Sequence, residues 1–479
     1  MSRYIQKRIT RLLKNIKDTQ RKKAYVKCQE NIELLIQCLS SIGLEESKAV
    51  ELLDSHYKLL FKVHTKQTND KLLIGSLSKI LTCEDLKLNQ NEFEVAFIVH
   101  IASMSDSLES IYLAAKEDNN CVAHWIVVPY CEVKDYQIQN IMHFEGEGHY
   151  DERFDITPWK EYNLEAHRPD IIFTLNAYDA NNTVTTIYHE FYSQTICNFT
   201  DLLVYVPYFI DIDTGLEENF ALVPSCVFAN KVTLATEKLR EHYIDTYSKK
   251  YGNEFGKPED KFVALGSPKY DKVINTKRDD YELPETWKTL VGEKKVITYI
   301  SSVMSVLEKR DIYLNKLKTI LDVFKSRDDV VLWWRPHPLI ENTIKSMLPD
   351  MLESYQEIVA EFKNDDEGIF DDTSDLHRAI AWSDGYYGDR SSLIMLYQCV
   401  GKPVMIADTT SRTEQLRPVL DGCFFEGDSS KDTLESFINL VIKSNETDDR
   451  IFNKAVDIVN KDGTAGKAIF EYAKKCIGI

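Results

Sequence analysis

Long apolar runs are absent from this sequence of 479 residues. None reaches the roughly 18 residues that a membrane-spanning helix requires. The basic start of the chain also lacks the apolar core and the small-residue cleavage site of a secretory signal. The 10 cysteines form no Cys-x-x-Cys pair, which argues against a zinc ribbon and is typical of reduced thiols. We therefore expect a cytoplasmic globular protein.

Common cofactor and nucleophile motifs are missing too. There is no Gly-x-Gly-x-x-Gly, no Walker A and no Gly-x-Ser-x-Gly, which disfavours a nicotinamide dehydrogenase, a P-loop nucleotidase and a serine hydrolase. The run from His189 to Ser193 is not a zinc-protease motif, because it ends in serine rather than histidine. His143 and His149 are spaced to chelate a metal, but a surface loop is the more ordinary role for them. We predict no metal and no cofactor.

The charge of the chain is unevenly distributed. Residues 1–27 carry a net charge of +9 and the whole chain carries −18, so the remainder carries −27. An acidic body is a poor platform for nucleic acid. Within the basic segment Ile5, Ile9, Leu12, Leu13 and Ile16 recur at helical spacing. This pattern predicts an amphipathic helix, which either lies on an anionic membrane surface or packs on the protein with its basic face in water.

The chain is too long for one hydrophobic core and falls into three parts. Residues 1–90 have apolar positions at helical spacing and form a helical appendage, basic at its start. Short β runs then alternate with helical stretches in two blocks, 91–275 and 276–479, and the last helices of the second block can cross back. The strands are expected at 95–99, 122–128, 170–174, 202–206, 231–234, 261–265, 295–300, 329–334, 368–370, 404–406 and 423–425. This alternation predicts an α/β fold of two doubly wound, Rossmann-like domains that face a cleft.

Three polar segments in the second block follow strands or interrupt apolar runs. Ser301 and Ser302 end one strand, and Arg335-Pro-His-Pro338 ends the next. The third segment, 383–392, reads as a glycine-containing loop whose two last residues are serines that open a helix. Ligands bind at the carboxyl ends of strands in such sheets, and free N–H groups at a helix start favour anions. The three segments together predict a site for a nucleotide diphosphate-linked donor.

Individual roles in this predicted donor site follow from side-chain chemistry. Arg335 offers a rigid fork that matches phosphate, and His337 can donate to a phosphate oxygen or protonate the departing nucleotide. The alternative for this turn is a rigid corner closed by an ordinary Arg–Asp pair. Asp384 and Asp389 would repel phosphate, so they shape the loop, pair with Arg335 or bind a ribose hydroxyl. The donor-binding residues are predicted to be Arg335, Ser301, Ser302, Asp384, Gly388, Asp389, Ser391 and Ser392.

The first block must then hold the acceptor and a base. The segment 176–182 follows a clear strand and is rich in groups that bind hydroxyls. Asp179, within it, and His189 are the two candidates for the base, so His337, His189 and Asp179 are the predicted catalytic residues.

These segments resemble the CDP-glycerol glycerophosphotransferase family, the teichoic-acid-type polymerases and primases with a GT-B fold. The family pattern is an Arg-x-His-Pro turn, a loop with Asp and a Ser-Ser pair, and a Lys-Pro strand, which here are residues 335–338, 384–392 and 402–403. Gly266-Ser-Pro-Lys-Tyr-Asp271 is similar to the hinge motif of the family. The loop is longer here than the family's Asp-Tyr-Ser-Ser. The histidine loop that carries the family's acceptor-side base has no clean counterpart. The resemblance covers residues 170–410 and implies that Arg335, His337, Ser391 and Ser392 contact the donor pyrophosphate.

The resemblance implies a transferase of cell-surface polysaccharide biosynthesis, in teichoic acid or capsule assembly. It would move glycerophosphate, or a related phosphopolyol or glycosyl unit, from a donor such as CDP-glycerol to a hydroxyl of a glycan or lipid-linked acceptor. Working from the cytoplasm, it would meet the inner membrane face as a peripheral protein through residues 1–27. The alternatives are a nucleotide-sugar glycosyltransferase, a non-hydrolysing epimerase, or a GT-B scaffold without catalysis.

Overall fold

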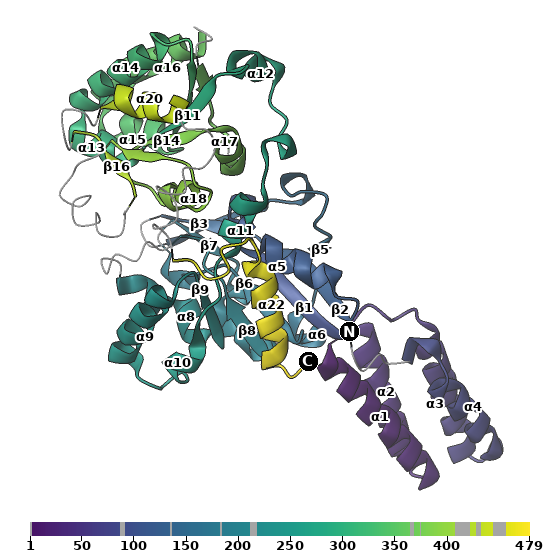
Figure 1. Cartoon of the computed structure of the whole chain (residues 1–479). Helices are drawn as coiled ribbons and strands as arrows, with labels where there is room; N and C mark the ends of the chain where they lie inside the picture. The colour runs from purple at the N-terminus through teal and green to yellow at the C-terminus, as the bar shows by residue number, and fades with distance from the viewer. Residues whose placement is uncertain are drawn as a thin grey trace.

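The computed structural model describes residues 2–86, 92–134, 137–182, 184–210, 218–364, 368–373, 375–407, 422–427, 433–443 and 457–479. Two parallel sheets form two α/β halves, and a helical arm projects from the first half on the side away from the second (Figure 1). This confirms the predicted fold class, two doubly wound domains with an N-terminal helical appendage.

The first sheet has seven parallel strands in the order β10-β9-β8-β6-β1-β2-β5. The strands are β1 (Phe93–Val99), β2 (Cys121–Val127), β5 (Ile156–Pro158), β6 (Ile171–Thr174), β8 (Leu202–Tyr205), β9 (Lys231–Leu234) and β10 (Phe262–Ala264). Alternate residues of β1 pack with α5 (Asp106–Glu117) and α22 (Ala465–Cys476) on one face, and the apolar cluster on the other face of the sheet includes residues of α9 (Glu237–Tyr251). Because helices cover both faces, these strands are continuous apolar runs, which made them recognisable in the sequence.

The second sheet has six parallel strands in the order β13-β12-β11-β14-β15-β16. They are β11 (Lys295–Ser301), β12 (Val330–Pro336), β13 (Gly368–Phe370), β14 (Gly385–Gly388), β15 (Val404–Ile406) and β16 (Phe424–Phe425). Its larger cluster of buried side chains joins the sheet to α14 (Asp311–Lys325), α16 (Leu352–Asn364) and α20 (Leu434–Lys443). Other helices described in this half are α12 (Glu285–Val291), α13 (Val303–Lys309), α15 (Ile340–Met347), α17 (Leu376–Trp382) and α18 (Leu393–Cys399).

Strand β14 corrects the prediction of a loop over 383–392. Tyr386 and Tyr387 are fully buried in the middle of the sheet. Gly388 has φ +151°, and a Cβ there would lie 2.2 Å from the carbonyl oxygen of Ile300 on β11. The glycine therefore serves close strand packing, and the true loop comprises only residues 389–392.

A third, antiparallel sheet was not predicted. It has the order β4-β3-β7 and consists of β3 (Tyr130–Lys134), β4 (Gln137–His143) and β7 (Thr185–Ile187). It continues from the carboxyl end of β2, so it lies at that edge of the first sheet. Short helices α6 (Leu164–His167), α7 (Ser193–Ile196), α8 (Pro224–Phe228) and α10 (Pro258–Lys261) complete this half.

The arm consists of α1 (Arg3–Arg21), α2 (Tyr25–Ser40), α3 (Lys48–His64) and α4 (Lys71–Leu81). The apolar stripe of α1 is buried against the rest of the arm, so it is not offered to a membrane. Lys7, Arg11 and Lys14 on its other face are exposed. Two forms were considered for this helix. The structure adopts the one in which the helix packs on the protein with its basic face in water. Among the described residues, no helix has the length and apolarity to span a bilayer.

Helix α11 (Pro268–Asn275) joins the two halves and contains the last four residues of the hinge-like motif. Tyr270 and Val273 pack among residues of the second sheet. Asp271 faces the first half, where its carboxylate accepts hydrogen bonds from the Ser110 hydroxyl at 2.8 Å and from the N–H groups of Ala465 and Gly466 at 3.0 and 2.7 Å. One short helix therefore fixes α5, the start of α22 and the second domain.

Asp271→Ala should lower the free energy of unfolding by about 3 kcal/mol, because it leaves two buried N–H groups and a hydroxyl without their acceptor. Urea unfolding followed by circular dichroism measures this change. Asp245→Ala, which removes an exposed ion pair with Lys249, is the matched control and should cost less than about 0.5 kcal/mol. Equal effects of the two substitutions would show that Asp271 does not hold the halves together.

Candidate functional site

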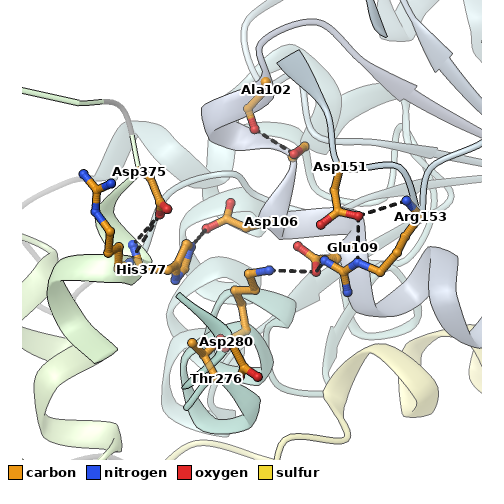
Figure 2. Close-up of polar contacts among 12 residues, drawn as sticks. Ala102, Asp106, Glu109, Asp151, Arg153, Thr276, Asp280, Asp375 and His377 are labelled. Carbon is orange, nitrogen blue, oxygen red and sulfur yellow. Dashed lines mark hydrogen bonds and ion pairs between the residues drawn. The ribbon is translucent and has the colours of Figure 1, made fainter. Parts of the chain in front are cut away.

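The carboxyl ends of the two parallel sheets meet at a buried contact between the two halves. Asp106 begins α5, which follows β1, and His377 lies in the first turn of α17, which follows β13. Their side chains point toward each other (Figure 2), with 3.0 Å between the His377 Nε2 and the Asp106 Oδ2. Loops after the strands of both sheets therefore face each other at this contact, as the fold class predicts.

Asp106 also binds the hinge helix. Its Oδ1 accepts a hydrogen bond from the Lys269 Nζ at 2.6 Å, and all three side chains are about nine-tenths buried. Burial alone would raise the pKa of Asp106, but the charge of Lys269 and the hydrogen bond from His377 hold it well below its usual value. The carboxylate thus stays charged while it joins α5, α11 and α17.

Two of the predicted donor segments lie side by side at this edge of the second sheet. The His337 N–H donates to the Ser301 carbonyl at 3.2 Å, which joins the ends of β11 and β12. The Ser302 N–H donates to the Asp389 carboxylate at 2.7 Å, which joins β11 to the loop after β14. The Ser301 hydroxyl points inward and accepts from Tyr313 at 3.2 Å. Asp389 therefore shapes the loop, one of the roles that the sequence left open.

Arg335 forms the Arg–Asp pair that was the alternative for its turn. Its guanidinium donates to the Asp371 carboxylate and to the Thr373 carbonyl, each at 2.6 Å. Asp371 is buried and also accepts from Trp333 and Thr373. Burial alone would raise the pKa of Asp371, but the charge of Arg335 and the hydrogen bonds from these donors hold the pKa below its usual value. The pair fixes the plane of the guanidinium at the strand end.

His337 has a defined tautomer. Its Nδ1 accepts a hydrogen bond from the Leu339 N–H at 3.2 Å, so the proton of the neutral ring is on Nε2. Loss of solvation lowers the pKa of His337 below its usual value. The neutral ring can therefore donate a hydrogen bond from Nε2 at neutral pH.

The serine pair closes the same edge. The Ser391 hydroxyl accepts from the Leu393 N–H at 3.1 Å, and Ser392 directly precedes α18 and is exposed. The structure thus brings Ser301, Ser302, Arg335, His337, Asp389, Ser391 and Ser392 to the ends of three adjacent strands.

Asp384 lies at the opposite edge of the sheet. Its carboxylate accepts from the Val296 N–H at 2.8 Å and pairs with Lys295 and Arg278, beside the start of β11. We therefore leave Asp384 out of the site. Lys402 of the Lys-Pro pair is likewise structural, because its ammonium donates to carbonyls at the end of α17, and burial lowers its pKa to about 8.

His189 and Asp179 lie at the carboxyl edge of the first sheet. The Tyr188 N–H donates to the Pro129 carbonyl at 2.9 Å, which places His189 beside the end of β2, where its side chain is exposed. Asp179 is buried and accepts from the hydroxyl and the N–H of Ser193 at 2.5 and 3.0 Å. Burial raises its pKa. Because its oxygens are engaged, Asp179 is better placed to hold the 189–193 segment than to take a proton.

Three titratable residues that follow strands of the two sheets were not identified from the sequence. They are Asp106, His377 and His100, which directly follows β1 and is 6% exposed. Burial lowers the pKa of His100 to about 4. His100 could have been identified from the sequence, because it directly follows a predicted buried strand. Asp106 and His377 are 271 positions apart and carried no local signal of their contact.

A cavity of about 430 Å³ lies beside α11 and is lined by Glu109, Arg153, Lys272, Asp280 and Tyr281, among others. Glu109 accepts from both Arg153 and Lys272, at 2.8 and 2.9 Å (Figure 2). None of the predicted donor residues lines this cavity. The facing strand ends remain the candidate site, because polar loops of both sheets lie there.

Solved structures share the fold of this chain. A protein assigned as a UDP-N-acetylglucosamine 2-epimerase from Listeria monocytogenes is 16% identical, with a TM-score of 0.51, over 80% of this chain and 96% of its own. A UDP-GlcNAc 2-epimerase from Neisseria meningitidis bound to UDP-GlcNAc is 13% identical over 80% and 100%, with a TM-score of 0.46. The wall teichoic acid polymerase TagF with CDPG is 14% identical over 90% and 97%, also with a TM-score of 0.46. No family model and no curated protein matches the sequence.

The buried Asp106 should make the domain contact sensitive to acid. A carboxyl whose pKa is depressed by folding stabilises the protein above its unfolded pKa, near 3.8, and loses this contribution as the pH falls through the folded pKa. Asp106→Asn should therefore lower stability at pH 7 by about 3 kcal/mol and flatten the loss of stability below about pH 4.

Thermal unfolding between pH 7 and pH 2.5 measures both effects. Asp245→Asn, which changes an exposed partner of Lys249, is the control and should keep the wild-type pH profile. An unchanged profile in Asp106→Asn would contradict the assigned contact.

Proposed function

We propose that this protein is a transferase that uses a nucleotide diphosphate-linked donor. In this proposal it moves a glycerophosphate or related phosphopolyol unit, from a donor such as CDP-glycerol, to a hydroxyl of a cell-surface glycan or lipid-linked acceptor. The observation that supports it best is the convergence of the loops after β11, β12 and β14. That edge presents Arg335, the neutral His337 and the serine hydroxyls, all suited to phosphate oxygens.

The donor diphosphate would lie against these strand ends. Arg335 would use the guanidinium N–H groups that face away from Asp371, and His337 would donate from Nε2. Both groups would stabilise negative charge on the leaving nucleotide. Because Asp371 already fixes the guanidinium, little ordering of the arginine would be needed when the donor binds.

The acceptor would approach from the first domain. His189 is the proposed base, because its ring is exposed at the facing edge, and Asp179 is the residue that positions its segment through Ser193. The acceptor oxygen would attack the phosphorus of the donor and give its proton to His189. The bond between that phosphorus and the pyrophosphate oxygen would break, so CMP would leave from CDP-glycerol.

Arg335→Lys should weaken nucleotide binding about 10- to 100-fold, because it keeps the charge beside Asp371 but loses the fork of charge-assisted hydrogen bonds, worth about 1.5–3 kcal/mol. Calorimetric titration with CDP and CMP measures the loss. Arg327→Lys is a matched control, since Arg327 pairs with Asp329 before the start of the same strand. If both variants bind nucleotide like the wild type, the pyrophosphate assignment is wrong.

His189→Ala should lower turnover about 100- to 10,000-fold, the range of general-base catalysis, and leave nucleotide affinity unchanged. Steady-state release of nucleotide from CDP-glycerol and direct titration separate the two properties. His242→Ala, on α9 of the same domain, is the control and should keep full turnover. Wild-type turnover in His189→Ala would remove it from the mechanism.

A further inference from the structure

We infer that Glu94, His124 and His167 form a binding site for a transition-metal ion of the zinc type, distinct from the candidate site at the strand ends. Glu94 is near the start of β1, His124 is on β2 and His167 ends α6. The ligating atoms of the three side chains lie within 4.8 Å of one another. Two imidazole nitrogens and one carboxylate oxygen are a donor set that suits Zn²⁺ and disfavours Mg²⁺ and Ca²⁺.

The distances are close to those of a metal centre. The Glu94 Oε1 lies 3.4 Å from the His124 Nε2 and 2.8 Å from the His167 Nδ1. Two ligands of a tetrahedral zinc are roughly 3.3 Å apart, given bonds of about 2.0 Å. The first pair already fits this spacing, and the second must widen by about half an ångström.

Outer hydrogen bonds hold these side chains in the required directions. The Tyr162 hydroxyl donates to the Glu94 Oε1 at 2.7 Å, and the Thr157 hydroxyl lies 3.2 Å from the His124 Nδ1. Metal binding needs a lone pair on the His124 Nε2, so the ring proton must move to Nδ1. Thr157 can accept that proton in a hydrogen bond, because a hydroxyl both donates and accepts. Such outer partners orient the ligands of metal sites.

Access from solvent is preserved although Glu94 is buried. The side chains of His124 and His167 are 21% and 18% exposed, whereas that of Glu94 is 2% exposed. An ion can therefore enter from the histidine side. Three protein ligands leave a fourth position for water.

The site lies where the arm is attached to the body. The Ser2 hydroxyl donates to the His167 carbonyl. Arg3 pairs with Asp170 at 3.1 Å, and Asp170 accepts from the Glu94 N–H at 2.9 Å. A metal bound by Glu94, His124 and His167 would join β1, β2 and α6 beneath the first turn of α1. We therefore assign it a structural role, as a brace for the root of the arm.

The test uses the full-length chain without an affinity tag, after removal of metal with a chelator. Titration with Co²⁺, followed by visible absorption, and competition with Zn²⁺ report stoichiometry and geometry. We expect one equivalent to bind with a tetrahedral spectrum, and Zn²⁺ to raise the melting temperature and slow amide exchange in α1. Lack of stoichiometric binding by the wild type would overturn the proposal.

Variants identify the ligands. His124→Ala and Glu94→Gln should each weaken binding more than 10-fold, and Thr157→Val, an outer partner, about 10-fold. His143→Ala is the matched control, because His143 also pairs with a glutamate, at 3.2 Å, on the small sheet. If the His124→Ala variant binds Co²⁺ as tightly as the His143→Ala variant does, the metal is held by other residues. Since His124 is part-exposed on β2, its variant is the one best suited to retain the fold.

Discussion

The buried carboxylates of Asp106 and Asp271 are the constraint on which the arrangement of the two halves depends. Asp271 accepts three hydrogen bonds from α5 and from the start of α22, and Asp106 binds Lys269 and His377. Both contacts involve α11, whose apolar side chains belong to the second domain. A buried carboxylate is costly unless its partners are in place. The pairing therefore favours one relative placement of the two sheets over others.

That placement sets the carboxyl ends of the sheets against each other. Each sheet alone presents polar loops at that edge, but neither closes a site. The hinge brings the Arg335 turn and the loop after β14 opposite the edge that holds His100 and His189. A donor and an acceptor held on opposite walls would react as one bound complex, which is the main catalytic advantage that such a cleft offers. The proposed metal centre lies on β1 and β2, apart from these groups, and concerns the arm instead.

Much of the fold could be predicted because its strands are buried on both faces. Runs such as Val95–Val99 and Val330–Trp334 are continuously apolar, and helices of 3.6-residue period separate them. Strand β14 was not predicted because Gly-Tyr-Tyr-Gly has neither an alternation of apolar and polar residues nor a β-branched residue. Only the fold shows that Gly388 packs against Ile300. Because residues 383–392 were read as one loop, Asp384 was assigned to the carboxyl edge of the sheet. It lies at the opposite edge, beside the start of β11. The apolar stripe of α1 predicted a helix correctly, but a stripe does not say whether lipid or protein covers it.

The positions of Ser301 and Arg335 at strand ends were predictable from residue type and pattern, and that of Ser391 just before a helix from the serine pair; their role in donor binding stays a prediction. The contact between Asp106 and His377 was not, because it joins distant parts of the chain and neither residue belongs to a motif. The Arg335–Asp371 pair shows a related limit: the sequence offered phosphate binding and an ion pair as alternatives. The structure has the ion pair, and phosphate binding by the same guanidinium stays a proposal.

The most direct measurement of the central claim is nucleotide release by the wild-type protein. It would be incubated with CDP-glycerol or UDP-N-acetylglucosamine and a soluble glycerol phosphate acceptor, and the products would be separated by chromatography. CMP should appear in an amount equal to the glycerophosphate transferred. Epimerised UDP-N-acetylglucosamine without nucleotide loss, or no turnover and no nucleotide binding, would contradict it.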